Sequence, residues 1–259
     1  MDYFKKIDNK LNNDLVWNVP EQKQGKVNVI GGNSQSFKTE IKISEFLLNK
    51  YPIETLNAVL PDALKNELPP FPNFKFLKST DSGSFADEKE MTEIFNSGDF
   101  NLLLGDLSKN SITGKIMLGA CENTEKPLLI TRDAIDLLLE NLAEKSLING
   151  NLIFFGSMVQ IQKLLKAVFY PRMLLLSQSL IQVAETLHKF TLSYPVAIIT
   201  LHNNQILIVK DGSVKDVPIE KSGWTPMTIW QGELAAKILA LNLYNPNNFT
   251  NATISALFS

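Results

Sequence analysis

Ser222-Gly-Trp-Thr-Pro-Met-Thr-Ile-Trp-Gln-Gly-Glu-Leu-Ala-Ala-Lys-Ile-Leu-Ala-Leu241 is the segment that carries most information about this chain. Its first part has the composition of a loop, and residues 229–243 have the composition of a helix. Thr228 and Gln231 have the spacing of a capping box at the helix start. Gly232 and Glu233 are therefore expected in the first helical turn. Because free backbone N–H groups at a helix N-terminus bind anions, the segment predicts an anion site with a carboxylate beside it.

Upstream of this segment, apolar strand-like runs alternate with amphipathic helix-like runs. This alternation is typical of a mainly parallel sheet that helices cover on both faces. The turn at residues 202–204 separates two adjacent strands and predicts a hairpin. The expected strands are 26–30, 57–60, 74–77, 100–104, 127–131, 151–155, 196–200 and 205–210, and the expected helices are 37–50, 87–97, 111–121, 135–143, 159–168 and 172–190.

The length, hydrophobic content and net charge of the chain limit the classes of fold and function. The chain has 259 residues, of which 44% are hydrophobic, and this suits one α/β domain with a substantial core. We expect residues 1–24 to form an arm or a short helix and residues 25–259 to form a single domain. A net charge of −2 gives no electrostatic case for nucleic acid.

No apolar run reaches the roughly 18 residues of a membrane span, so we expect no membrane association. The N-terminus also lacks the apolar region of a signal peptide. Cys121 is the single cysteine, which excludes an internal disulfide. We expect it to be a buried residue and the protein to be cytoplasmic. With only two histidines and one cysteine, the sequence indicates no zinc site, and we expect no metal held by protein side chains.

Polar residues and glycines recur where the predicted strands end. Ligands of parallel sheets lie beyond the carboxyl ends of the strands, so these turns predict one shared cleft. The alternative is that polar residues simply populate turns. The candidate nucleotide- or substrate-binding residues are Gly31, Gly32, Asn33, Gly105, Asp106, Asp133, Ser157, His202, Asn203, Gln231 and Gly232.

Glu233 is the candidate catalytic residue. As a base it would take a proton from a substrate hydroxyl while the helix N-terminus holds phosphate. The alternative is a first-turn carboxylate that only interacts favourably with the helix dipole. Trp224 and Trp230 are expected to pack rather than to stack on a base.

A second glycine motif follows the first predicted strand. Residues 32–39 nearly match the P-loop pattern, with Lys38 and Thr39 in place. Phe37 replaces the glycine before the lysine, and its side chain opposes the close approach of backbone to phosphate. We therefore interpret the segment as an ordinary strand-to-helix turn that lines a pocket, with a P-loop as the alternative.

The order of these turns resembles that of the ADP/ATP-dependent NAD(P)H-hydrate dehydratases, a branch of the ribokinase-like superfamily. The resemblance covers residues 25–258. The last similar motif along the chain is Gly232-Glu-Leu-Ala-Ala, which is similar to the Gly-Asp-Val-Leu-Ala of that family. The other similar segments are Val27–Asn33 (first strand and Gly-Gly-Ser turn), Leu102–Gly105, Lys126–Ala134 (Lys-Pro-Val-Val-Leu-Asp-Ala-Asp-Ala, which places Asp133 on its second aspartate), Ile153–Gln160 and the hairpin Ile199–Val214.

The resemblance implies a three-layer α/β/α ribokinase-like fold with a mainly parallel central sheet and a hairpin near the C-terminal part. It also implies a lyase of metabolite repair that uses ATP or ADP, with Mg²⁺, to dehydrate the hydrated form of NADH or NADPH. The family aspartate at the position of Glu233 acts as base, and the loop N–H groups form an anion hole. A small-molecule kinase of the same superfamily and a homo-oligomeric assembly stay open.

Several residues depart from the family pattern. Thr131, Ser157 and Gln160 stand where the family has aspartate, histidine and glutamate, and Ile229 and Trp230 replace glycines of the anion-hole loop. Glutamate in place of aspartate moves the carboxylate outward by roughly 1.5 Å, and a misplacement of about 1 Å can cost about a hundredfold in rate. These departures favour a second hypothesis, a pseudoenzyme that acts by binding a ligand or a protein partner.

Overall fold

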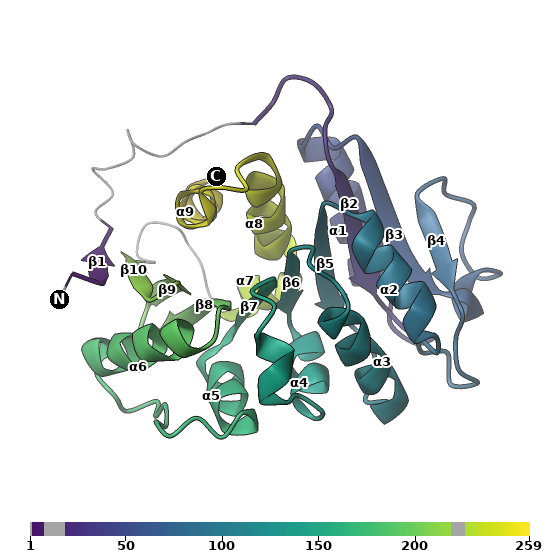
Figure 1. The fold of residues 1–259 in the computed structure, drawn as a ribbon. Coiled ribbons are helices and arrows are strands. Elements are labelled where there is room, and N and C mark those ends of the chain that lie inside the picture. Colours follow the sequence, from purple (N-terminus) through teal and green to yellow (C-terminus); the bar gives the residue numbers. More distant parts are fainter. Residues whose placement is uncertain (1, 8–18, 219–225) are drawn as a thin grey trace.

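The computed structural model describes residues 2–7, 19–218 and 226–259. In these residues ten strands form one sheet, in the order β1-β10-β9-β8-β7-β6-β5-β2-β3-β4 (Figure 1). The strands are β1 (Phe4–Lys6), β2 (Lys26–Gly31), β3 (Thr55–Pro61), β4 (Phe74–Leu77), β5 (Phe100–Gly105), β6 (Leu128–Thr131), β7 (Leu152–Ser157), β8 (Ala197–His202), β9 (Gln205–Lys210) and β10 (Ser213–Pro218).

Helices cover both faces of this sheet, as the alternation of strands and helices predicts. Figure 1 shows α2 to α6 on one side of the sheet and α1, α8 and α9 on the other. The helices are α1 (Lys38–Lys50), α2 (Glu88–Ser97), α3 (Ser111–Glu122), α4 (Asp133–Leu139), α5 (Met158–Ala167), α6 (Leu180–Ser193), α7 (Pro226–Gln231), α8 (Glu233–Tyr244) and α9 (Phe249–Phe258), with short 3₁₀ turns at Asp62–Leu64 and Glu144–Leu147.

The strands from β8 through β7, β6, β5, β2 and β3 to β4 are all parallel. The chain runs outward from β2 to β4 in one direction and from β5 to β8 in the other. The order of strands therefore reverses between β2 and β5, which is where open parallel sheets form their ligand crevice. β9 is antiparallel to β8 and confirms the predicted hairpin.

Alternating side chains divide the core into two layers. Leu103 of β5 packs with the layer of α2 to α6, whereas Leu102 and Leu104 pack with α1, α8 and α9. This follows from the period of two along a strand. Because both faces are buried, the central strands read as continuous apolar runs, and this is why the sequence locates them well. Cys121 is buried as expected, and burial raises the pKa of its thiol.

The expected helix over residues 172–190 is wrong at its start. Helix α6 begins at Leu180, and residues 172–179 form turns and irregular chain. Ser179 caps α6, because its side chain accepts a hydrogen bond from the Gln182 N–H while the Gln182 side chain accepts one from the Ser179 N–H. This capping box sets the first turn, and the leucines before it contribute no helical face.

The expected single helix over residues 229–243 is two helices. Gly232 separates α7 from α8 with a left-handed backbone, φ 82°, which glycine adopts without a Cβ penalty. The predicted capping box at Thr228 and Gln231 is therefore wrong, since both residues lie in α7 and Gly232 is the N-cap of α8. Helix α9, which packs beside α8, was not expected from the sequence.

The N-terminal segment adds a strand to the far edge of the sheet. Residues 4–6 form β1, which pairs in parallel with β10, rather than a helix. Residues 8–18 of the expected arm and Trp224 lie outside the described residues. Among the helices of the described ranges, none combines the length and apolar character that crossing a membrane requires.

Candidate functional site

The ends of β2 and β5 approach closely where the strand order reverses. Gly31 is paired with Gly105, and the Gly32 N–H donates a hydrogen bond to the Gly105 carbonyl oxygen at 2.9 Å. A Cβ atom on Gly31 would lie 2.5 Å from that carbonyl oxygen and 2.4 Å from Oε1 of Glu40. Only glycine fits this position. Two glycine turns that are far apart in the sequence, Gly31-Gly32 and Gly105, thus lie side by side at the carboxyl edge of the sheet, and we call them the glycine floor.

Asp106, Arg132 and Asp133 form a polar cluster on this floor. The Asp106 N–H donates to Oδ1 of Asp133 at 3.0 Å, and Nη2 of Arg132 donates to Oδ1 of Asp106 at 2.9 Å. The Asn33 side-chain amide donates to the Asp106 carbonyl oxygen. Asp106 and Arg132 have φ values of 54° and 56°, a region that residues other than glycine rarely occupy. Residues kept in such conformations concentrate at functional sites, so the cluster is a site candidate on structural grounds.

Glu40 is a site residue that the sequence analysis missed. Its side chain is fully buried beside Gly31, and neither carboxylate oxygen has a hydrogen-bond partner among the described residues. Burial raises the pKa of the Glu40 carboxyl well above its ordinary value, nearby Asp106 raises it further, and Arg132 lowers it. A signal was present, since Glu40 shares the apolar helix face of Ile43 and Leu47 at spacings of three and seven residues.

Replacing Glu40 by glutamine tests its protonation state. Because the folded pKa is raised, the native state holds this proton more tightly than the unfolded state. The contribution of Glu40 to stability is therefore greatest below the ordinary value of 4.5 and is lost as the pH rises through the folded pKa. We expect Glu40→Gln to become more stable relative to wild type by up to about 1.4 kcal/mol per pH unit across this window.

Urea titrations of the two proteins at a series of pH values from 4 upward measure the difference in the free energy of unfolding. A constant difference at all pH values would show that the pKa of Glu40 is the same in the native and unfolded states.

The start of α8 lies over the end of β5. A Cβ atom on Gly232 would lie 3.0 Å from Leu104 Cδ1 and 3.3 Å from Ile43 Cδ1, so the helix start packs onto β5 and α1. Glu233 occupies the first turn, with 37% of its side chain exposed, and forms an ion pair of 2.8 Å with Nζ of Lys42. The structure therefore places Gly232 against Leu104, the residue before Gly105, and Glu233 beside Lys42 of α1. Gln231 is exposed at the end of α7.

Trp230 packs against Arg132 at the surface of the protein and not in its core. The residue is 48% exposed, and its ring lies over the Arg132 guanidinium, with 5.4 Å between Cζ and the ring centroid. Two clefts border it, one of about 1150 Å³ and one of about 520 Å³, and both also contain Asp136 and Lys163. Asp133 borders the larger cleft and Ser157 the smaller.

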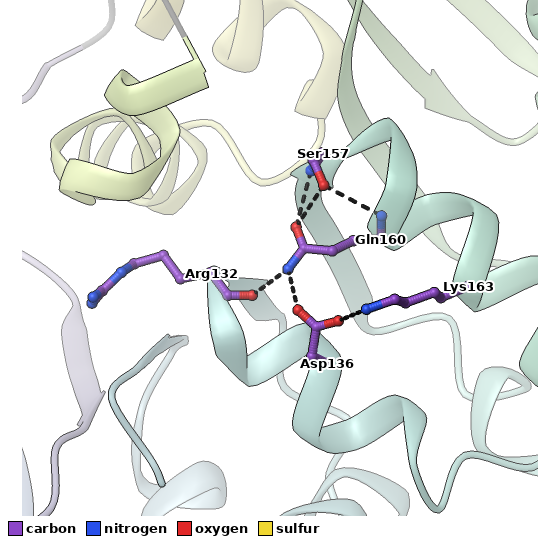
Figure 2. Close-up of polar contacts among 5 residues, drawn as sticks. All are labelled: Arg132, Asp136, Ser157, Gln160 and Lys163. Atoms are coloured by element: carbon purple, nitrogen blue, oxygen red, sulfur yellow. Dashed lines mark hydrogen bonds and ion pairs between the residues drawn. The ribbon is translucent and has the colours of Figure 1, made fainter. Parts of the chain in front are cut away.

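Ser157 and Gln160 organise the end of β7 (Figure 2). The two residues form a capping box at the start of α5. Nε2 of Gln160 also donates to the Arg132 carbonyl oxygen at 2.7 Å and to Oδ2 of Asp136 at 2.8 Å. Figure 2 shows the Arg132 side chain pointing away from these partners. Gln160 thus fixes the strained backbone of Arg132 by a hydrogen bond to its carbonyl oxygen. Ser157 has a structural role as the N-cap of α5, and its role as a binding residue stays a prediction.

His202 and Asn203 form the β8–β9 turn and are engaged with each other. Nε2 of His202 lies 3.1 Å from the Gln178 carbonyl oxygen and 3.1 Å from the Asn203 side-chain amide, and the imidazole is buried. No hydrogen bond or ion pair connects them to the glycine floor within the described part of the chain. Their role as binding residues stays a prediction.

The hydrogen bonds within the loop that follows β2 contradict the P-loop alternative. The Asn33 N–H donates to the Ser36 carbonyl oxygen, and the Ser36 N–H donates to the Asn33 carbonyl oxygen. The Ser34 N–H donates to the Gly83 carbonyl oxygen, and the Gln35 N–H donates to Oδ1 of Asn33. These groups are therefore not free to hold a phosphate, as a P-loop requires. Among the residues described, no group of three or more histidine, cysteine, aspartate or glutamate side chains is placed to hold a metal ion.

We expect Lys38→Ala to change nucleotide affinity by no more than about threefold, or about 0.7 kcal/mol. Lys38 is exposed, and its loop offers no phosphate cradle. Isothermal titration of both proteins with ATP measures the ratio. A loss of a hundredfold or more, about 2.7 kcal/mol, would restore the P-loop interpretation.

Comparison with solved structures places this geometry among known folds. No protein-family model and no curated protein matches the sequence. Hypothetical protein SMU.573 from Streptococcus mutans superposes with a TM-score of 0.66 at 16% identity, covering 98% of this chain and 88% of that one. YxkO from Bacillus subtilis, a member of the UPF0031 family, gives 0.60 at 12% identity, covering 93% and 82%.

The ADP/ATP-dependent NAD(P)H-hydrate dehydratase from Bacillus subtilis, co-crystallised with ATP/Mg²⁺ and soaked with CoA, gives a TM-score of 0.58 at 11% identity, covering 93% of this chain and 82% of that one. The chain has a ribokinase-like fold. At these identities the likeness shows the fold alone, and it confirms the expected three-layer α/β/α arrangement. In this ribokinase-like fold the start of α8, with Gly232 and Glu233, lies over the end of β5, one of the two strands between which the strand order reverses.

Proposed function

We propose that this ribokinase-like chain binds ATP or ADP at the carboxyl edge of its sheet and uses it to dehydrate a hydrated nicotinamide cofactor, NAD(P)H hydrate. The observation that supports this most is the place of Gly232 and Glu233, the N-cap and the first residue of α8, over the end of β5 where the strand order reverses. The helix start offers backbone N–H groups to phosphate, and Glu233 offers a carboxylate to the acceptor. The dehydratase with the same fold was crystallised with ATP/Mg²⁺.

In this proposal Glu233 is the base. It takes the proton of the cofactor's hydroxyl while the oxygen attacks the terminal phosphorus of the nucleotide, and the shortened nucleotide leaves. Loss of the new phosphate ester as inorganic phosphate, together with a ring proton, restores the double bond of the dihydronicotinamide. Backbone N–H groups at the start of α8 stabilise the negative charge that develops on the phosphoryl oxygens. Any Mg²⁺ would be held chiefly by the phosphates.

A second candidate is a pseudoenzyme that binds the nucleotide without turnover. Two observations favour it. Glu233 is engaged with Lys42 in an ion pair, and Ile229 and Trp230 belong to a helix where the resembling family has a glycine loop. A carboxylate that is paired and one methylene longer than aspartate is a poorer base at the same place.

A thermal-shift titration with ATP, ADP, NADH and NADPH, each with and without Mg²⁺, tests the binding step. A ligand that binds only the folded state stabilises it by about 2.7 kcal/mol at a hundred times its Kd, which is readily seen. No shift with ATP or ADP would contradict the proposal. Restoration of NADH absorbance from its hydrate then separates the enzyme from the pseudoenzyme, and a stable phosphorylated product would indicate a small-molecule kinase.

A further inference from the structure

Arg132 is a buried cation whose hydrogen-bonding capacity is mostly unused. Only 5% of its side chain is exposed, and Nη2 binds Asp106, whereas Nε and Nη1 have no hydrogen-bond partner among the described residues. Oδ2 of Asp106 and both oxygens of Glu40 are likewise unpaired. Buried polar atoms in proteins are nearly always paired. Several unpaired atoms in one cluster therefore indicate a place where a polar ligand is accommodated.

Trp230 lies between the Arg132 guanidinium and the larger cleft. The indole lies over the Arg132 guanidinium and itself borders the cleft of about 1150 Å³, whose lining residues do not include Arg132. The cleft wall carries three lysines and three carboxylates, from Lys109, Lys163, Lys166, Asp133, Asp136 and Glu140. A guanidinium stacked on an aromatic ring is stabilised, but a ring forms no hydrogen bonds with its N–H groups. The contact is therefore one that a hydrogen-bonding anion can replace.

We propose that Arg132 binds a phosphoryl group of the ligand and that Trp230 covers its guanidinium until the ligand enters. Arginine donates two parallel hydrogen bonds to phosphate along an edge of its guanidinium, and each such edge pairs Nη2 with Nε or with Nη1. Nε and Nη1 have no partner among the described residues, and Nη2 has a second N–H besides the one that Asp106 accepts. Gln160 positions the arginine through the Arg132 carbonyl oxygen, and Asp106 anchors Nη2. The inference rests on the proposed nucleotide site, to which it adds the side chain that recognises phosphate.

The test uses tryptophan fluorescence of the full chain during titration with inorganic pyrophosphate and, separately, with ATP. Binding moves the Trp230 indole off Arg132, so we expect a saturable change in emission that is absent in Trp230→Phe. We expect Arg132→Gln to weaken both ligands by at least about tenfold, and Arg132→Lys, which keeps the charge but loses the fork, to weaken them less. Arg172→Gln is the matched control, because Arg172 is the other arginine of the chain and lies at the surface with Glu185, so its affinities should equal those of wild type.

A second variant, Trp230→Ala, tests the proposal independently of whether Arg132→Gln folds. Trp230→Ala uncovers the guanidinium, and we expect it to bind pyrophosphate more tightly than wild type in isothermal titration. Unchanged or weaker binding by Trp230→Ala would overturn the covering role. Equal affinity of Arg132→Gln and wild type for ATP would overturn the role of Arg132 and leave the proposed function intact.

The remaining outcomes separate the two proposals. Pyrophosphate binding that depends on Arg132, without any binding of ATP, would support the phosphate site and contradict the proposed function. Absence of binding of both ligands to wild type would overturn both proposals.

Discussion

The Glu233→Gln variant is expected to lose turnover of hydrated NADH by about 10²–10⁴-fold, the usual contribution of a general base. Glutamine keeps the size of the side chain and its place in the first turn of α8, but it cannot accept the hydroxyl proton. ATP affinity should change little, because backbone N–H groups rather than the carboxylate hold the phosphates in the proposed site. Single-turnover kinetics with the restored NADH as the signal, together with ATP titration, measure the two effects separately.

Glu185→Gln is the control for the loss of an ion pair. Glu185 of α6 pairs with Lys189 of the same helix and with Arg172, which precedes the helix, as Glu233 pairs with Lys42 of α1. It borders neither of the clefts at the site. A partly exposed pair such as Lys42–Glu233 contributes at most about 1 kcal/mol, so both variants should fold like wild type. Full activity of Glu233→Gln would show that another group is the base. A wild-type protein that binds ATP tightly and never restores NADH would support the pseudoenzyme.

The Gly31→Ala variant is expected to lower the free energy of unfolding by about 1–3 kcal/mol, the usual cost of an overpacked core. Its Cβ would lie 2.5 Å from the Gly105 carbonyl oxygen, and backbone in two central strands cannot move aside as a flexible side chain can. The melting temperature should fall by roughly 2–4 °C for each kcal/mol in a protein of this size. Denaturant titration and thermal melts measure both quantities.

Gly119→Ala, in α3, is the matched control for adding a methyl group. Its Cβ would approach only the carboxylate end of Glu88, an exposed side chain that can turn away. Alanine is also the better helix former by about 1 kcal/mol, so this variant should be as stable as wild type or more stable. If Gly31→Ala were as stable as Gly119→Ala, β2 and β5 would have room at their ends, and the glycine floor would have no steric basis.

The central strands and most helices could be predicted from the sequence because their signals are local. Parallel strands buried on both faces read as short apolar runs, as in Phe100–Gly105, and the amphipathic helices between them have a different period. The same local signal placed Gly232 and Glu233 near a helix start. The break at Gly232 was missed because alanine- and leucine-rich sequence on its far side continues the helical pattern.

The edges of the sheet and the partners of the site could not be predicted in this way. β1 is three residues long and is ordered by its pairing with β10, some 210 positions away in the sequence. Glu40 could have been noticed as a carboxylate on an apolar helix face, but no local signal assigns Asp106, Arg132 and Trp230 to its neighbourhood. Their contacts join turns after β5 and β6 to helices α1 and α7.

The sequence alone determined the class of the fold, the order of its layers and the presence of glycine turns at the strand ends, because hydrophobic period and turn chemistry act over a few residues. Only the tertiary structure decided that the turns at Gly31 and Gly105 meet where the strand order reverses, that Glu233 pairs with Lys42, and that Arg132 is buried between Asp106 and Trp230. These are contacts between segments that the chain brings together only when the sheet and its covering helices have formed.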